Sequence, residues 1–287
     1  MTERRRQQPI AADHFGVRLS EWRARRRESQ LDLAISANIS QRHLSFVESG
    51  RSLPSRDMVV RLCEALDIPL RARNELLISA GYAALYPERS LELSQMESVR
   101  EALTRIVAHH EPYPAFVVDR GWLVVMSNES ARRMVAACLD AATIRALSAD
   151  GALNFMRMMF EPVEMRPRIR NWQVVAPLLL ARLRNEAGED PQSPSTALLK
   201  ELGPQAKVDR TSEGPDRIEL PIIPLELDVA GVTLRLFNTI TTFGTPQDVG
   251  LQELRIELSY PMDSATQAFL TEALKQDGPR PKQTAEP

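Results

Sequence analysis

The chain has 287 residues, of which 36 are Lys or Arg, 38 are Asp or Glu and only two are Cys. At about 150 residues per domain, this length predicts two domains, each long enough to bury its own core. Two cysteines are too few for a disulfide framework or a cysteine-rich metal site, and no apolar run approaches the ~18 residues of a membrane span. The polar, Arg-rich first ten residues lead into no apolar core, so we expect no secretory signal and a cytoplasmic location without membrane association.

The net charge of −2 conceals an asymmetry along the chain. Residues 1–90 contain 15 Arg, no Lys and 11 acidic residues, which gives +4, and the remainder carries −6. A basic first third before an acidic remainder is the distribution expected of a nucleic-acid-binding module joined to another domain. A charge of +4 over 90 residues is also within ordinary variation, so charge alone leaves this question open.

Five short helices are predicted in the first ninety residues, over 15–27, 30–37, 41–49, 56–66 and 71–80. Ser29 and Ser40 stand where the second and third helices need N-caps, and Gly50 stands where the third helix needs a C-cap. Asn38 lies between these two helices and tolerates the left-handed conformation that a tight turn requires. Two short helices joined by such a turn form a helix-turn-helix.

The residues around this turn are more specific than the helix pattern alone. They read SQLDLA over 29–34, ANIS over 37–40 and VESGR over 47–51. Over about residues 13–80 the sequence therefore resembles the lambda-repressor/Cro-like, or XRE, family of bacterial regulators. The resemblance implies an all-α DNA-binding domain whose third helix enters the major groove of double-stranded DNA.

The resemblance also implies which side chains contact DNA. The base-reading positions fall on the start and outer face of the third helix, at Gln41, Arg42, Ser45 and Phe46. Glutamine suits a bidentate contact to adenine, arginine suits guanine, and an aromatic ring can meet a thymine methyl group. Phosphate or groove-edge contacts are expected from Gln30, Ser40, Arg51 and Arg56.

Two further positions have more than one interpretation. Arg23 and Glu48 align with an ion pair of the family that locks the first helix to the third, although each could be solvated separately. The pair is favoured because removing one partner from a buried pair is costly. Phe46 departs from the polar residue that is more usual in the family, and it could instead pack against the second domain or a dimer partner.

Domain boundaries follow from changes in pattern. The helix-turn-helix domain is expected over residues 13–81, after a flexible segment over 1–12. Residues 82–94 contain Pro87 and lose helical periodicity, which predicts a linker. The second domain then extends over 95–275, and residues 276–287 are expected to be disordered.

The second domain combines both kinds of secondary structure. We expect helices over 99–110 and 129–139, then a helical segment to residue 203 that is interrupted by a loop over 188–195. Strands are predicted over 114–119, 122–126, 217–229, 232–243 and 251–260, before a last helix that ends near residue 275. In the last strand Leu254, Ile256, Leu258 and Tyr260 alternate with Arg255, Glu257 and Ser259, as in a strand with one buried face.

Several segments of this half are characteristic of a known module. They are PAFVVD over 114–119, NW over 171–172, TTFGTPQD over 241–248, LQELRIE over 251–257 and PMD over 261–263. The half resembles the ligand-binding domain of MmyB-like transcription regulators, a PAS-like module. The resemblance implies a five-stranded antiparallel sheet with helices, and hence an α+β chain, around a pocket for a hydrophobic, fatty-acid-like molecule.

A ligand pocket needs an apolar lining with few polar groups. The candidate lining residues are aromatic or Met side chains: Phe116, Met126, Phe155, Met156, Met159, Trp172 and Phe237. Met suits an adaptable pocket because it is flexible and polarisable. The alternative is that this cluster is plain hydrophobic core, which is the commoner role of such residues.

No catalytic or metal site is expected. His109 and His110 are adjacent on a predicted helix and point in different directions, so one ion cannot easily bind both. A self-cleaving Ser–Lys dyad needs a lysine on a strand. Here the lysines, Lys200, Lys207, Lys275 and Lys282, lie in no predicted strand.

Together these features predict a bacterial, nucleoid-associated transcription regulator, a repressor by the habit of the family. A homodimer would place two recognition helices about 34 Å apart on a pseudo-palindromic operator, under the control of a small hydrophobic effector. The rival hypothesis is that the second domain is a protein-interaction module, for RNA polymerase or an antitoxin-type partner, with a merely packed interior.

Overall fold

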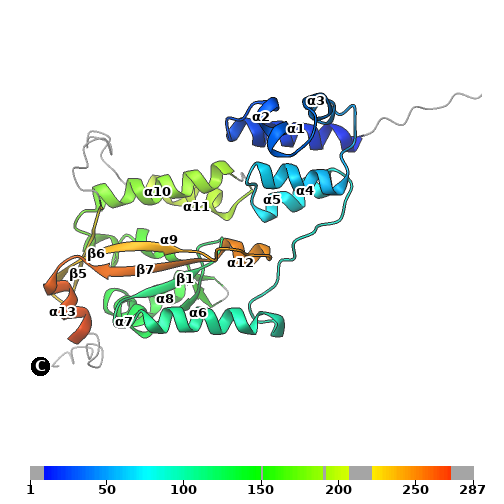
Figure 1. Cartoon of the computed structure of the whole chain (residues 1–287). Helices are drawn as coiled ribbons and strands as arrows, with labels where there is room; N and C mark the ends of the chain where they lie inside the picture. The colour runs from blue at the N-terminus through cyan, green and yellow to red at the C-terminus, as the bar shows by residue number, and fades with distance from the viewer. Residues whose placement is uncertain (1–9, 150, 190–191, 207–221, 273–287) are drawn as a thin grey trace, which may run out of the picture. The chain divides into compact units, whose positions relative to one another are not determined.

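The computed structural model describes residues 10–149, 151–189, 192–206 and 222–272. The chain divides into two compact units, coloured from blue to red along the sequence in Figure 1. The helical unit comprises the chain up to Arg89 together with Gly244–Gln252, and the sheet unit comprises Ser90–Phe243 and the chain from Glu253 onward. This α+β architecture confirms the predicted fold class. Within the described ranges, no helix is both long and apolar enough to cross a membrane.

The helical unit contains five helices, α1 (Ile10–Arg25), α2 (Gln30–Ser36), α3 (Gln41–Glu48), α4 (Arg56–Ala65) and α5 (Leu70–Ser79). The side chains of Ser29 and Ser40 cap α2 and α3 by accepting hydrogen bonds from backbone N–H groups. Asn38 has φ 52° and Gly50 has φ 69°, so the turn and the C-cap adopt the predicted left-handed conformations. The core is closed by side chains from all five helices, including Phe15, Leu19, Leu33, Leu44, Val59, Leu62 and Leu77.

Residues 244–252 belong to the helical unit although the flanking sequence belongs to the sheet unit. Helix α12 (Val249–Glu253) begins in this segment and occupies the start of the strand that was predicted from residue 251. The Val249 N–H donates to Pro87 O at 2.8 Å, and the Arg89 N–H donates to Asp248 Oδ2 at 3.2 Å. The strand prediction began too early because these long-range contacts, which a local pattern does not record, stabilise a helical turn.

The side chain of Gln252 caps the N-terminus of α5. The residue that precedes this helix is Pro69, whose side chain offers no hydrogen-bond acceptor. The side-chain oxygen of Gln252 accepts from the Leu70 N–H at 2.7 Å instead. The predicted linker is also anchored here, since the Asn74 amide donates to Tyr86 O at 2.7 Å.

The sheet unit is built on one antiparallel sheet of order β2-β1-β7-β6-β5. Its strands are β1 (Ala115–Val118), β2 (Val124–Ser127), β5 (Leu225–Val229), β6 (Val232–Thr241) and β7 (Arg255–Pro261). The predicted five strands are confirmed, with shorter bounds. Residues 217–221 of the predicted third strand lie outside the described part of the chain.

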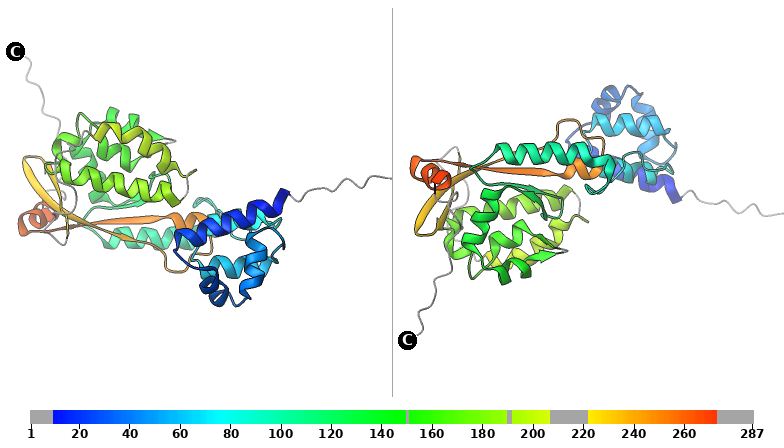
Figure 2. Two further views of the ribbon diagram at one scale, coloured as in Figure 1. Left: turned by 90° about the horizontal axis from the view of Figure 1, so that it is seen from above. Right: turned by 90° about the horizontal axis from the view of Figure 1, so that it is seen from below.

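Helices cover both faces of this sheet, as the two views of Figure 2 show. One face is covered by α6 (Glu97–His109). The other is covered by α7 (Glu129–Cys138), α9 (Phe155–Phe160), α10 (Trp172–Glu189) and α11 (Pro194–Leu202), and α11 begins inside the predicted loop over 188–195. The remaining elements are α8 (Ala141–Ala146), the unpredicted hairpin β3 (Ser148–Ala149) and β4 (Ala152–Leu153), α13 (Ser264–Glu272), and the 3₁₀ helices η1 (Ser94–Met96), η2 (Arg166–Arg168) and η3 (Pro204–Ala206).

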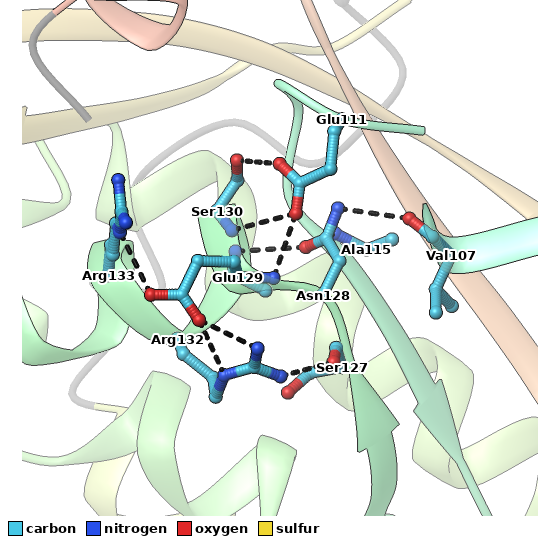
Figure 3. A network of polar contacts seen from close by, with 10 residues as sticks. Val107, Glu111, Ala115, Ser127, Asn128, Glu129, Ser130, Arg132 and Arg133 are labelled. Carbon is cyan, nitrogen blue, oxygen red and sulfur yellow. Dashed lines mark hydrogen bonds and ion pairs between the residues drawn. The ribbon is translucent and has the colours of Figure 1, made fainter. Parts of the chain in front are cut away.

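A buried asparagine ties β1, α6 and α7 together. Asn128 Oδ1 accepts from the backbone N–H groups of Ala115 and Ala131, both at 3.0 Å. Its Nδ2 donates to Val107 O at 3.2 Å and to Tyr113 O at 2.7 Å. Figure 3 shows Asn128 at the centre of this network. Every hydrogen-bonding position of the amide group is therefore used for the fold.

Candidate DNA-binding surface and ligand cavity

The predicted base-reading residues share one face of α3. Leu44 and Val47 are buried in the core, whereas Gln41 and Arg42 are exposed and Ser45 and Phe46 are half-buried. Positions 41, 42, 45 and 46 follow the helical repeat, so the four side chains form one patch. The guanidinium carbon of Arg42 lies 5.5 Å from the centre of the Phe46 ring, a cation–π distance. Phe46 thus supports Arg42 within the patch.

The residues predicted to contact phosphate differ in whether their side chains already bond to other protein groups. Arg51 and Arg56 are exposed, and neither side chain bonds to another described residue. Ser40 Oγ accepts from the His43 N–H at 3.2 Å, so its first role is to cap α3. Gln30 Nε2 donates to Glu48 Oε2 at 2.7 Å, which fixes the amide nitrogen at the start of α2.

Arg23 and Glu48 form a bidentate ion pair between α1 and the end of α3. Arg23 Nε donates to Glu48 Oε1 at 2.7 Å, and Nη2 donates to Oε2 at 3.0 Å. The Glu48 side chain is 7% exposed. The hydrogen bonds to Glu48 raise the pKa of the Arg23 guanidinium. The pair brings α1 and α3 together, as the resemblance implied.

Sequence reasoning missed Gly16, which lies at the crossing of α1 and α3. A Cβ atom at this position would lie 2.3 Å from Glu48 O and 2.7 Å from Val47 O. Both distances are far below van der Waals contact, so only glycine permits this approach. The available signal was a glycine inside an amphipathic helix, which often marks close packing.

The sheet unit contains a cavity of about 270 Å³ between the sheet and its larger helical layer. This volume is close to the ~300 Å³ lower bound of typical small-molecule sites. Most of the lining is apolar, and the helical side is rich in Met. The lining includes Phe116, Met134, Val135, Cys138, Phe155, Met158, Met159, Met165, Val175, Leu178, Leu179, Leu225, Leu227, Leu236 and Ile240.

Three of the seven predicted lining residues, Phe116, Phe155 and Met159, contribute to the cavity. Met126 and Phe237 lie on the opposite face of the sheet, because they pair in register with Val117 and Tyr260 rather than with cavity-facing residues. The other two belong to the packed core. Met156 is fully buried without reaching the cavity, and the Trp172 indole donates to Ala206 O at 2.7 Å.

Two polar residues of β7 face the cavity. Glu257 and Ser259 are only 2% and 5% exposed, and both line it. Because helices cover both faces of the sheet, this strand has two buried faces rather than the single one that its alternation indicated. Arg182 of α10 donates to Glu257 Oε1 at 2.6 Å. Sequence reasoning missed this pair, although a charge inside an apolar strand is a usable signal.

The Arg182–Glu257 pair is part of a larger cluster around Trp122. The guanidinium carbons of Arg182 and Arg255 lie 4.3 and 4.1 Å from the centre of the indole ring. The indole N–H and Arg255 both donate to Glu186. Burial lowers the pKa of Arg255, and the carboxylates oppose this effect. Two arginines and two glutamates thus neutralise one another.

The adjacent histidines form hydrogen bonds with different backbone carbonyl groups. His109 Nδ1 lies 2.7 Å from Arg105 O, and His110 Nε2 lies 2.8 Å from Ser259 O. Burial lowers the pKa of His110. Within the described ranges, no group of three or more His, Cys, Asp or Glu is placed to hold a metal ion.

Fold and site together define the class of the protein as a DNA-binding helix-turn-helix transcription regulator with a domain of ligand-binding type. Residues 14–76 match the sequence model of a helix-turn-helix domain, and residues 99–273 match that of the MmyB-like transcription regulator ligand binding domain. Since the second match spans more than half of the chain, the chain belongs to the MmyB-like family.

Two solved structures are similar to part of the chain. Both are crystal structures of the clp gene regulator ClgR from Corynebacterium glutamicum. One is 27% identical and covers 26% of this chain and 92% of its own, with a TM-score of 0.23. The other is 24% identical and covers 36% and 97%, also with a TM-score of 0.23. A comparison with curated proteins gave no match.

Proposed function

We propose that the protein binds a pseudo-palindromic operator as a cytoplasmic, nucleoid-associated homodimer, and that a small hydrophobic molecule in the cavity alters this binding. The observation that carries the proposal is a ligand-sized, mostly apolar cavity in the second unit of a helix-turn-helix regulator. An effector changes DNA binding only if it binds the DNA-bound protein and the free protein with different affinities. The family resemblance favours repression as the sign of regulation. It also implies that the molecule in the cavity has a fatty-acid-like chain. This function requires no catalytic step.

Arg42 and Arg56 are expected to contact different parts of the DNA, a base and a phosphate respectively. Arg42 lies among the predicted base readers, so Arg42→Ala should relax specificity at one base position, at a cost of about 1–3 kcal/mol for the preferred base. Arg56 is an exposed residue at the start of α4, so Arg56→Ala should weaken binding to all sequences and reduce the salt slope by about one. Binding of both variants to a randomised set of duplexes at several salt concentrations measures these effects. An equal loss on all sequences for Arg42→Ala would refute its role in base reading.

The connection between β6 and β7 supports a route from cavity to DNA. Both strands contribute lining residues, such as Leu236 and Glu257, and the segment that joins them belongs to the helical unit. Asp248 anchors this segment, because its buried carboxylate accepts from the Arg89 backbone and lies 3.3 Å from the Arg89 guanidinium. The segment therefore connects the cavity-lining strands to the helical unit along the chain, and we propose that ligand binding affects DNA binding through this connection.

Asp248→Ala should uncouple the two activities. We expect the variant to retain its small molecule, while the ratio of DNA dissociation constants between ligand-bearing and ligand-free protein falls to about one. Asp228→Ala is the control, because it removes a half-exposed carboxylate of the sheet unit that pairs with Arg170 and accepts from Thr233. An unchanged ratio in Asp248→Ala would exclude this route.

A further inference from the structure

The polar part of the cavity lining is concentrated on two neighbouring strands. In the register of the sheet, Asn238 of β6 lies opposite Ser259 of β7, and Ile240 lies opposite Glu257. On its other side Glu257 lies opposite Phe116. All five residues line the cavity, so one carboxylate, one hydroxyl and one amide form a polar strip on an otherwise apolar wall.

The charges of the lining are balanced before any ligand binds. Among the described lining residues only Arg182 and Glu257 are charged, and they form a direct ion pair. Arg182 Nε also lies 3.8 Å from Glu186 Oε1. A ligand carboxylate would therefore find no uncompensated cation, and it would enter an apolar cavity beside the buried negative charge of Glu257.

The same strip presents unused hydrogen-bond acceptors. Arg182 donates to Oε1 of Glu257, and no described residue donates to Oε2. Within the described ranges, the Ser259 hydroxyl and the Asn238 side chain also make no hydrogen bond to another protein group. A carboxylate oxygen accepts only, so its natural partner on a ligand is an O–H or N–H group.

We propose that the cavity binds an apolar molecule whose polar end is a hydrogen-bond donor, an alcohol or an amine, and that it discriminates against the carboxylic acid of the same chain. This inference rests on the proposed function, since it concerns the same cavity. It keeps the aliphatic chain that the family resemblance implies and replaces the carboxylic acid at its end with a hydrogen-bond donor. Glu257 is the residue that sets this preference, with Ser259 and Asn238 as neighbouring polar contacts.

Decanol, decylamine and decanoic acid test this preference, because they share a chain and differ in the polar group. We expect calorimetric titration of the full chain, first freed of any bound molecule, to show the alcohol and the amine binding at least about tenfold more tightly than the acid. Glu257→Gln keeps the shape of the side chain and leaves Arg182 with only its more distant carboxylate partner, Glu186. This variant should gain at least about tenfold in affinity for decanoic acid.

Glu201→Gln is the matched control, because it removes a half-exposed carboxylate that pairs with Arg157 outside the cavity lining. Its three affinities should equal those of the wild type. If Glu257→Gln fails to fold, the wild-type ratio still decides the question. Decanoic acid binding as tightly as decanol to the wild type would overturn the ligand class and leave the proposed function intact. Absence of binding by all three, together with purified protein that carries no small molecule, would overturn both.

Discussion

Asn128→Ala should lower the free energy of unfolding of the sheet unit by about 3–5 kcal/mol, because four hydrogen bonds to buried backbone groups are lost at once. The amide joins the end of α6, the start of β1 and the first turn of α7. Removing it leaves two backbone donors and two acceptors to find new partners. Urea unfolding followed by tryptophan fluorescence measures the change, since Trp122 and Trp172 are both buried in this unit.

Asn185→Ala is the control for this substitution. Asn185 is an exposed residue of α10, so its replacement should change stability by less than about 0.5 kcal/mol. Trp22 of the helical unit gives a separate signal, because the two units need not unfold in one step. A loss below about 1 kcal/mol in Asn128→Ala would show that the asparagine is not the anchor that its contacts indicate.

Gly16→Ala should destabilise the helical unit by about 2 kcal/mol or more, although alanine is the better helix former by about 1 kcal/mol. The added Cβ would collide with two backbone carbonyl oxygens of α3, which cannot move aside as a flexible side chain does. Helix α1 must therefore shift away from α3, which strains the Arg23–Glu48 ion pair. We expect weaker DNA binding as well, since α3 carries the predicted base readers.

Gly188→Ala is expected to raise the stability of the protein rather than lower it. Gly188 lies in α10 and has open space where a Cβ would be added, so helix propensity alone decides and a small stabilisation follows. Thermal unfolding of the two variants beside the wild type compares the two effects directly. A stabilised Gly16→Ala variant would contradict the close crossing of α1 and α3.

The helical unit was predictable because its signals are local. Ser29 and Ser40 cap the helices that follow them, and Asn38 and Gly50 adopt left-handed conformations that few other residues accept. The family resemblance added the expectation that the exposed α3 residues contact DNA bases, which stays a prediction. The resemblance did not identify Gly16, because the need for glycine there depends on the distance between α1 and α3.

The cavity was harder to predict because strand register decides which side chains share a face. Phe116 and Phe237 are similar in chemistry, yet the register places only Phe116 in the cavity. The alternation in β7 was correct, but it does not record that helices cover both faces of the sheet. For this reason Glu257 was missed as a lining residue.

Native mass spectrometry of the full chain on a duplex selected from random DNA tests the central claim, ligand-controlled operator binding, most directly. It counts protein copies and bound small molecules in each complex. We predict two copies per duplex, and a bound fraction of duplex that differs between protein with and without its small molecule, the latter obtained by organic extraction. One copy per duplex, or a bound fraction that does not depend on the small molecule, would contradict the account.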